Sequence, residues 1–138
     1  MSDKKHMVVA GGGRVGRRVS QFFMQRGYEV TVIEQDRDRA DQQAAAATDI
    51  VVGDATHPSV LAGALTDETT VIGALTDSDS TNLAVCLAAN TYQPELRTVA
   101  RIADADGDEY GQFVDDVVFP ERASVKTAVN ALSGSDVR

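Results

Sequence analysis

The chain has 138 residues, which fits one domain that can bury roughly two-thirds of the surface its unfolded form would expose. Its formal net charge of -8 argues against nucleic acid as a partner, because binding to phosphates requires a basic rather than an acidic face. One cysteine and two histidines exclude an internal disulfide and a zinc site built on these residues. No apolar run reaches the roughly 20 residues that span a bilayer, so we expect a cytoplasmic protein without direct membrane insertion.

The two acidic residue types, and likewise arginine and lysine, occur in unequal numbers. Aspartates (15) outnumber glutamates (6), and arginines (10) outnumber lysines (3). This skew resembles that of cytoplasmic proteins from salt-loving archaea, and it favours such a source over an ordinary acidic protein. The composition therefore predicts a protein from a halophilic archaeon.

Short apolar runs recur along the chain, and segments with helical spacing follow most of them. This alternation indicates parallel strands that crossover helices cover on both faces. We therefore predict one α/β domain over residues 1–138, with a Rossmann-like, doubly wound, parallel sheet of six strands and helices on both faces. The predicted strands are residues 7–10, 30–33, 50–52, 71–75, 98–102 and 117–119.

The first helix is predicted from an apolar stripe at helical spacing, formed by Val15, Val19, Phe22 and Phe23. We expect this stripe to face the sheet and the helix to stop near Gly27, a natural left-handed cap.

Later helices carry their own start and stop signals. Asp36 is expected to cap a helix with alanines at 40, 44 and 47, and a third helix covers residues 60–65. The last helix is expected to start after Pro120, to carry apolar residues over 125–132 and to stop at Gly134.

The fourth helix, over residues 80–90, has more apolar surface than one sheet requires. Its stripe for the sheet is predicted to be Leu83, Ala84, Leu87 and Ala88. Val85 and Cys86 would then lie on the remaining side, where they could contact a second copy of the chain. We therefore expect a homodimer through this face.

The sequence Gly11-Gly12-Gly13-Arg14-Val15-Gly16 joins the first predicted strand to the first helix. Gly11 allows a tight turn, Gly13 lets the backbone approach a pyrophosphate, and Gly16 lets the helix pack close to the strand. The pyrophosphate would lie on the free N–H groups at the helix start. The alternative is a strand-helix corner without a ligand.

Glu34 ends the second predicted strand, about 20 residues beyond this turn. An acidic side chain at that place accepts hydrogen bonds from both hydroxyls of an adenine ribose. The turn and Glu34 together predict an adenine nucleotide, with NAD(H) favoured and ATP or ADP as the alternatives.

With these motifs in hand, the sequence resembles the N-terminal nucleotide-binding lobe of the regulator of potassium conductance family, which includes the Trk potassium-uptake regulator. The resemblance covers nearly the whole chain. It is carried by residues 8–16, 32–34, 53–56, 74–77 and 118–121, in that order. Members of the family usually continue into a second, C-terminal ligand-binding lobe, which we expect to be absent from this chain.

The resemblance implies further contacts with the nucleotide. Asp54 and Ala55 would border the adenine, whereas on the residues alone Asp54 could simply cap the next helix. Thr76 and Asp77 end the fourth predicted strand and would overlook the ligand crevice, and they too could cap a helix.

Two arginines complete the candidate site. By the resemblance, Arg14 would reach a terminal phosphate of ATP or the nicotinamide-side phosphate of NAD. Its alternative is a solvated side chain, which the helix dipole disfavours at this end. Arg101 interrupts the fifth apolar strand, and either a ligand or subunit contact or an internal ion pair would explain it.

The resemblance implies a cytoplasmic regulator that controls a potassium transporter or channel, its membrane partner, by a nucleotide-dependent shift between two arrangements. The alternatives are an NAD-dependent oxidoreductase and an assembly module that uses the nucleotide only for folding. We expect no catalytic residue, because no nucleophile stands in a recognisable setting. The acidic run at 104–109 has its glycine fourth rather than sixth, so we expect a solvated loop and no metal site.

Overall fold

The computed structural model describes residues 5–104 and 107–134. Six parallel strands form one sheet in the order β3-β2-β1-β4-β5-β6, which confirms the predicted doubly wound fold. The strands are β1 (His6–Ala10), β2 (Glu29–Glu34), β3 (Asp49–Val52), β4 (Thr69–Ala74), β5 (Arg97–Arg101) and β6 (Asp116–Val118). All six predicted strands are present, with ends that differ by one or two residues.

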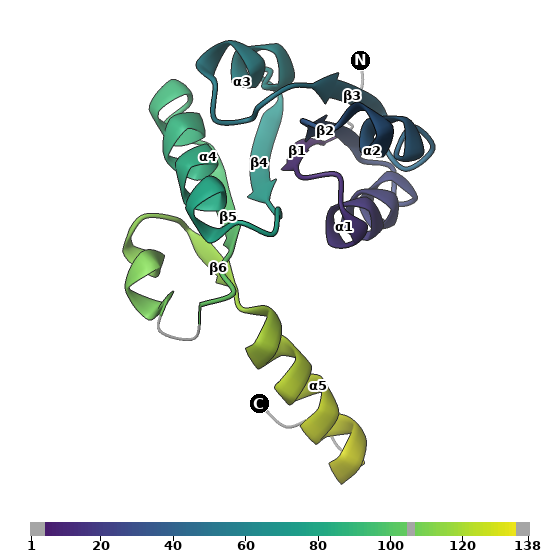
Figure 1. The fold of residues 1–138 in the computed structure, drawn as a ribbon, viewed down its shortest axis with the longest axis vertical. Coiled ribbons are helices and arrows are strands. Elements are labelled where there is room, and N and C mark those ends of the chain that lie inside the picture. Colours follow the sequence, from purple (N-terminus) through teal and green to yellow (C-terminus); the bar gives the residue numbers. More distant parts are fainter. Residues whose placement is uncertain (1–4, 105–106, 135–138) are drawn as a thin grey trace.

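Helices connect these strands, and Figure 1 shows α1 and α2 on one side of the sheet and α4 on the other. They are α1 (Arg14–Met24), α2 (Arg37–Gln42), α3 (Pro58–Ala64), α4 (Asp79–Tyr92) and α5 (Pro120–Ser133), with a 3-10 segment η1 (Gly107–Gln112) before β6. No helix in the described part of the chain is long and apolar enough to cross a membrane. Residues 105 and 106 of the predicted acidic loop lie outside the described residues.

Alternate residues of β1 face two separate cores. Val8 and Ala10 contact the cluster under α3 and α4, whereas Met7 and Val9 belong to a second cluster on the α1 side. Because β1 is buried on both faces, nearly all its residues are apolar.

The chain leaves β1 through α1 on one face, and it leaves the neighbouring strand β4 through α4 on the other. The carboxyl ends of β1 and β4 therefore flank the switch point, where doubly wound sheets bind ligands.

The buried face of α1 differs from the predicted stripe. Val15 and Phe22 are 49% and 46% exposed, while Gly16 and Ser20 are buried and Phe23 packs on the core. The small residues bring the helix close to the sheet, and the Ser20 hydroxyl donates to the Gly16 carbonyl at 2.8 Å, so its burial is satisfied. Gly27 has the expected positive φ, +88°, three residues beyond the helix.

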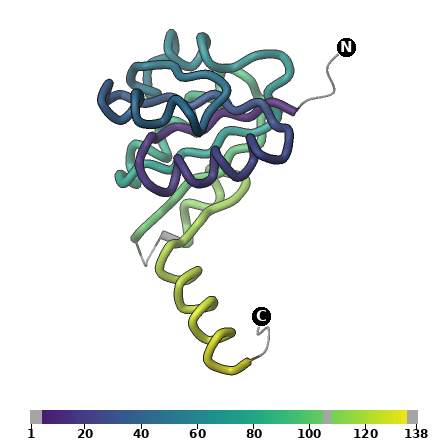
Figure 2. Tube along the Cα trace, turned by 90° about the vertical axis from the view of Figure 1, so that its right-hand side faces the viewer, coloured from purple at the N-terminus to yellow at the C-terminus, as the bar shows by residue number. Residues whose placement is uncertain are grey.

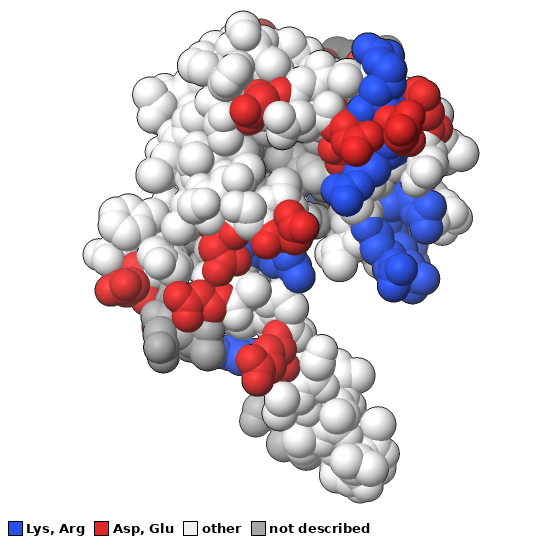
Figure 3. All heavy atoms as spheres, in the orientation of Figure 1, with Lys and Arg blue, Asp and Glu red and all other residues white. Residues whose placement is uncertain are grey.

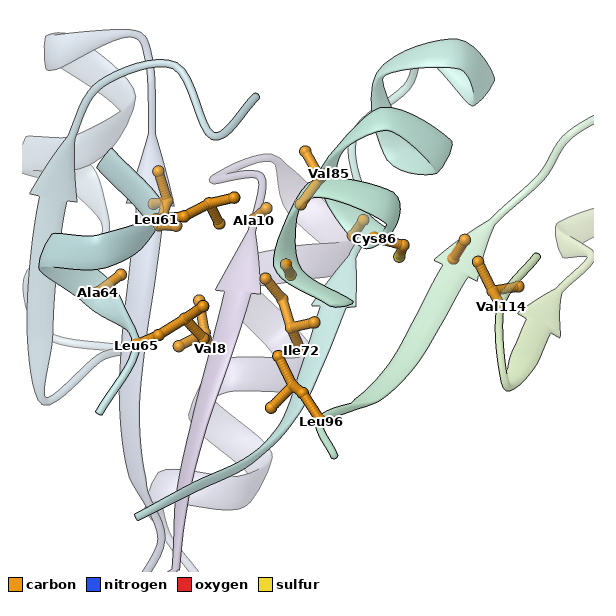
Figure 4. Close-up of a cluster of buried hydrophobic side chains, with 14 of the residues drawn as sticks. Val8, Ala10, Leu61, Ala64, Leu65, Ile72, Val85, Cys86, Leu96 and Val114 are labelled. Carbon is orange, nitrogen blue, oxygen red and sulfur yellow. The ribbon is translucent and has the colours of Figure 1, made fainter. Parts of the chain in front are cut away.

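The face of α4 that was predicted to pack on the sheet is wrong. Val85 and Cys86 are fully buried, and Figure 4 shows both in the core cluster, whereas Leu87 is 47% exposed. The polar residue Asn82 sets this rotation, because its amide is buried and shares a face with Val85, Cys86 and Ala89. The proposed contact through Val85 and Cys86 is therefore excluded. Burial also raises the pKa of the Cys86 thiol to about 12.

The caps of the other helices follow the sequence signals. The Asp36 carboxylate accepts from the N–H groups of Asp38 and Arg39 at 2.8 and 3.2 Å, as predicted. Of the alanine stripe, Ala40 is buried in α2, Ala44 is exposed, and Ala47 is buried beyond the end of the helix.

Helix α5 begins at Pro120 and ends at Gly134 in a left-handed conformation, as predicted. None of its residues is buried: Val125, Val129 and Leu132 are 57%, 42% and 88% exposed. Figures 1 and 2 show the helix extending away from the sheet. The apolar stripe therefore has no covering surface within the described part of this chain.

His6 begins β1 and, although polar, is only 6% exposed. Its Nδ1 lies 2.6 Å from the Thr69 hydroxyl, and its Nε2 lies 2.8 Å from the Thr31 hydroxyl. Burial lowers the pKa of His6, against the opposing effect of the carboxylates of Glu29, Glu68 and Asp49.

Candidate functional site

A cleft of about 640 Å³ opens at the carboxyl ends of the strands, over the switch point between β1 and β4. It collects nearly every site residue predicted from the sequence: Gly11, Gly13, Arg14, Val15, Glu34, Asp54, Ala55, Thr76, Asp77 and Arg101. Gly16 does not line it and lies behind the turn. Residues that the sequence reading missed also line the cleft, among them Gly12, Arg17, Arg39, Gln43 and Ser78.

The glycines of the turn have different tasks. Gly11 has a φ of +113°, and a Cβ there would lie 3.1 Å from the backbone of Leu75 and Thr76, so this position requires glycine. A Cβ on Gly16 would overlap the Gly11 carbonyl oxygen, so glycine there permits the close helix-strand packing. A Cβ on Gly13 meets nothing within 4 Å, so the protein itself leaves that space open.

Helix α1 starts beside this open space without a capping side chain. Its N-cap is Gly13, and no acidic residue lies in its first turn. The first N–H groups of a helix have no acceptor within the helix, and they carry the positive end of its dipole. Together with the exposed Arg14 and Arg17, they make this end of the cleft suitable for an anion.

Glu34 lies where the sequence places it, at the end of β2 and in the cleft wall, and is 6% exposed. Its Oε1 accepts from the Gly12 N–H at 2.5 Å, and its Oε2 accepts from the Asp36 N–H at 2.8 Å. Each carboxylate oxygen has two lone pairs, so one site on each oxygen remains for a ligand hydroxyl.

Gly12 is fixed on its other side by Gln43, which follows α2 and is fully buried. The Gln43 Nε2 donates to the Gly12 carbonyl and also approaches the Gly13 carbonyl at 3.3 Å. A Cβ on Gly12 would overlap the Glu34 carboxylate, which explains the middle glycine of the three. The motif spacing does not reveal these roles, because both partners are distant in the sequence.

Asp54 lines the cleft and does not cap a helix. Its Oδ1 accepts from the Thr56 N–H at 2.9 Å and from the Thr56 hydroxyl at 2.7 Å, and the N-cap of α3 is His57. The hydrogen bond from the Thr56 hydroxyl lowers the pKa of Asp54 most, and the bond from the Thr56 N–H lowers it further. This carboxylate therefore stays charged at neutral pH.

The far wall of the cleft is built on a hydrogen-bond network around the buried Asn82. The Asn82 Oδ1 accepts from the N–H and the hydroxyl of Thr76, at 3.0 and 2.6 Å. Its Nδ2 donates to the carbonyls of Thr76 and Arg101, at 3.0 and 2.7 Å. The cap of α4 is Ser78, which leaves the exposed Asp77 side chain at the cleft.

Arg101 reaches the same network from β5. Its Nη1 donates to the Thr76 carbonyl at 2.9 Å, while its Nε is buried without a hydrogen-bond partner. None of the ion pairs found among residues 5–104 and 107–134 involves Arg101, so the expected alternative of an internal ion pair is not observed.

The charge of the cleft differs from that of the chain. Four arginines (Arg14, Arg17, Arg39 and Arg101) and three carboxylates (Glu34, Asp54 and Asp77) line it, although the chain carries -8 overall. Figure 3 shows that the basic side chains on this face gather mainly over α1 and α2. An anionic ligand that also carries hydroxyl and amine groups fits this mixture.

Comparison with known proteins agrees with this geometry. Residues 7–120 match the TrkA-N domain family. A Trk system potassium uptake protein TrkA homolog from Pyrococcus horikoshii is 32% identical over 124 residues, which cover 84% of this chain and 54% of that protein. The chain thus spans about half the length of this relative.

Solved structures share the fold. The TrkA-N domain of the inner membrane protein ybaL from Escherichia coli has a TM-score of 0.84 at 21% identity, covering 96% of this chain and 99% of that one. The GsuK channel bound to NAD has a TM-score of 0.71 at 22% identity, covering 86% and 22%. GsuK bound to ADP has a TM-score of 0.74 at 25% identity, covering 93% and 34%.

Proposed function

We propose, because this chain belongs to the TrkA-N domain family, that it is a regulatory nucleotide-binding domain controlling a potassium transporter or channel. The observation that carries the proposal is the uncapped start of α1, which faces the same cleft as the Glu34 carboxylate. The domain would act in the cytoplasm, beside its membrane partner. Binding would bias that partner through a difference in nucleotide affinity between two arrangements.

The proposed ligand is NAD(H), with ADP or ATP as the alternatives. The N–H groups of α1 and Arg14 would hold the phosphates, and Glu34 would accept from the ribose hydroxyls. Asp54 and Ala55 would border the adenine. Thr76, Asp77 and Arg101 would contact the ligand from the opposite wall. GsuK shares this fold and has been solved bound to NAD and bound to ADP, which supports both kinds of nucleotide as candidates.

We propose binding without catalysis. The Pyrococcus horikoshii relative is a potassium uptake protein. The nucleotide fold takes up the described chain, so a substrate and its proton donor would have to come from elsewhere. Steady oxidation of NADH with alcohols, aldehydes or hydroxy acids above the buffer rate would favour the oxidoreductase alternative instead.

The proposed assembly is a homodimer. The exposed stripe of α5 supports it, because three apolar side chains at i, i+4 and i+7 face away from the rest of the described chain: Val125, Val129 and Leu132. A second copy carries the same stripe, so the two helices could cover each other.

Calorimetric titration with NADH, NAD and ADP tests the nucleotide site. Wild type should bind, and Gly13→Val should lose binding while it remains folded, because the added side chain would occupy the space of the phosphates. Gly63→Val is the matched control, since Gly63 also has open space around its Cβ but lies outside the cleft. Equal affinities of wild type and Gly13→Val would refute the assignment of the site.

Uptake of rubidium, a potassium analogue, tests the regulatory role. Cells that lack this protein should show altered uptake, which wild type restores and Gly13→Val does not. If Gly13→Val binds no nucleotide but still restores rubidium uptake, the role of the protein in transport does not depend on nucleotide binding in the cleft.

A further inference from the structure

Gly12 is fixed from both sides by buried side chains. Its N–H donates to Glu34 Oε1 at 2.5 Å, and its carbonyl accepts from Gln43 Nε2. Glu34 comes from the end of β2 and Gln43 from the residue after α2, so two separate elements hold one residue of the turn. Three consecutive glycines have little conformational preference of their own, which makes such a restraint necessary for a fixed turn.

Gln43 is an unusual residue to bury. It is fully inaccessible, yet its Oε1 has no hydrogen-bond partner. An unpaired buried acceptor costs stability. The Nε2 bonds to the Gly12 and Gly13 carbonyls are what the amide supplies in return.

The direction of a carbonyl fixes the direction of the next N–H. No peptide bond in the described chain is cis, and in a trans peptide the C=O of one residue and the N–H of the next point to opposite sides. The Gly13 carbonyl already accepts from the Arg17 N–H of α1 at 2.9 Å, so the direction of the Arg14 N–H is set by the helix. The Gly12 carbonyl is held toward Gln43, which turns the Gly13 N–H the other way. A carbonyl turned toward a bound phosphate would instead place two acceptor oxygens together.

We propose that Gln43 is a positioning residue of the nucleotide site, whose amide orients the N–H group of Gly13 toward the ligand phosphates. This inference rests on the proposed function of the cleft. Gln43 lies at the cleft but is inaccessible to solvent, and its Nε2 is engaged by the turn, so its proposed role acts through the turn. It prepares the turn before binding, so that less conformational freedom is lost when the nucleotide arrives.

The test compares wild type with Gln43→Met, which removes the amide and keeps the length of the side chain. ADP affinity should fall about tenfold, while adenosine, which has no phosphates, should bind both proteins within about twofold. The melting temperature of Gln43→Met should change by only a few degrees, because loss of the unpaired Oε1 offsets part of the cost of leaving the Gly12 carbonyl without its donor. Gln21→Met, an exposed change in α1 outside the cleft, should match wild type in every measurement.

The outcomes separate this inference from the proposed function. If wild type binds ADP and Gln43→Met binds it equally well, Gln43 does not position the turn. Equal losses for ADP and adenosine would mean a general structural role and would also overturn the inference. Absence of ADP and NADH binding by wild type would overturn the proposed function itself, and this inference with it.

Discussion

Two glycines within six residues of the end of β1 serve different purposes, one in folding and one in binding. A Cβ at Gly16 overlaps the Gly11 carbonyl oxygen, whereas a Cβ at Gly13 meets nothing. Gly16→Ala should therefore lower the free energy of unfolding by about 1–3 kcal/mol, because the helix must move away from the strand. Gly13→Ala is the control and should unfold like wild type in urea. Equal stability of the two variants would contradict the packing role of Gly16.

Glu34 should decide between NADH and NADPH. If its carboxylate accepts from the adenine ribose hydroxyls, a 2'-phosphate there would meet a like charge. NADH should bind wild type at least about tenfold more tightly than NADPH, which is about 1.4 kcal/mol. Titration of Glu34→Ala should show a preference shifted toward NADPH. Equal affinities in wild type, or an unshifted preference in the variant, would place Glu34 away from the ribose.

His6 should make stability depend on pH. Its pKa is lowered in the folded state from 6.5, so the unfolded chain binds more protons between the two values. The free energy of unfolding should therefore fall as pH drops below about 6.5, until the folded pKa is passed. His6→Gln keeps a polar side chain but lacks this titration. Denaturant unfolding between pH 7.5 and 5 should show a smaller pH slope for the variant, and equal slopes would exclude this contribution.

At the scale of one element, the rotation of α4 gives a paired prediction. Val85 is fully buried, and Leu87 is 47% exposed. Val85→Ala should cost about 2 kcal/mol of unfolding free energy, since it removes buried methyl groups and leaves a cavity. Leu87→Ala should change stability by no more than about 0.5 kcal/mol, although it removes more atoms. A larger loss of unfolding free energy in urea for Leu87→Ala than for Val85→Ala would support the buried face of α4 that the sequence predicted.

At the scale of the whole molecule, α5 should carry self-association. Val129→Glu places a charge in the exposed apolar stripe and should give a monomer by light scattering. Thr127→Glu, which lies on the opposite side of the helix, should leave association unchanged. Concentrated potassium chloride is needed in both measurements, because it screens repulsion between chains that each carry -8. A monomeric wild type under these conditions would refute the homodimer.

The sequence alone determined the features that depend on short-range pattern. The six strands follow from short apolar runs, because parallel strands buried on both faces need apolar residues at nearly every position. The turn at Gly11 and the helix ends at Asp36, Pro120 and Gly134 follow from local backbone and hydrogen-bonding preferences. Glu34 was found because the fold fixes its distance along the chain from that turn.

The tertiary structure alone decided which side of each helix is buried and which polar groups are paired. The apolar residues of α4 are spread over several sides of the helix, so periodicity does not identify its buried face. The hydrogen bonds of Asn82 to Thr76 and Arg101 fix that face in the folded protein. The burial of His6 depends on hydroxyls 25 and 63 residues away, and the place of Gln43 depends on a carbonyl 31 residues away. Such pairings join segments that only the folded sheet brings together. A buried polar side chain is stable only where a hydrogen-bond partner is present.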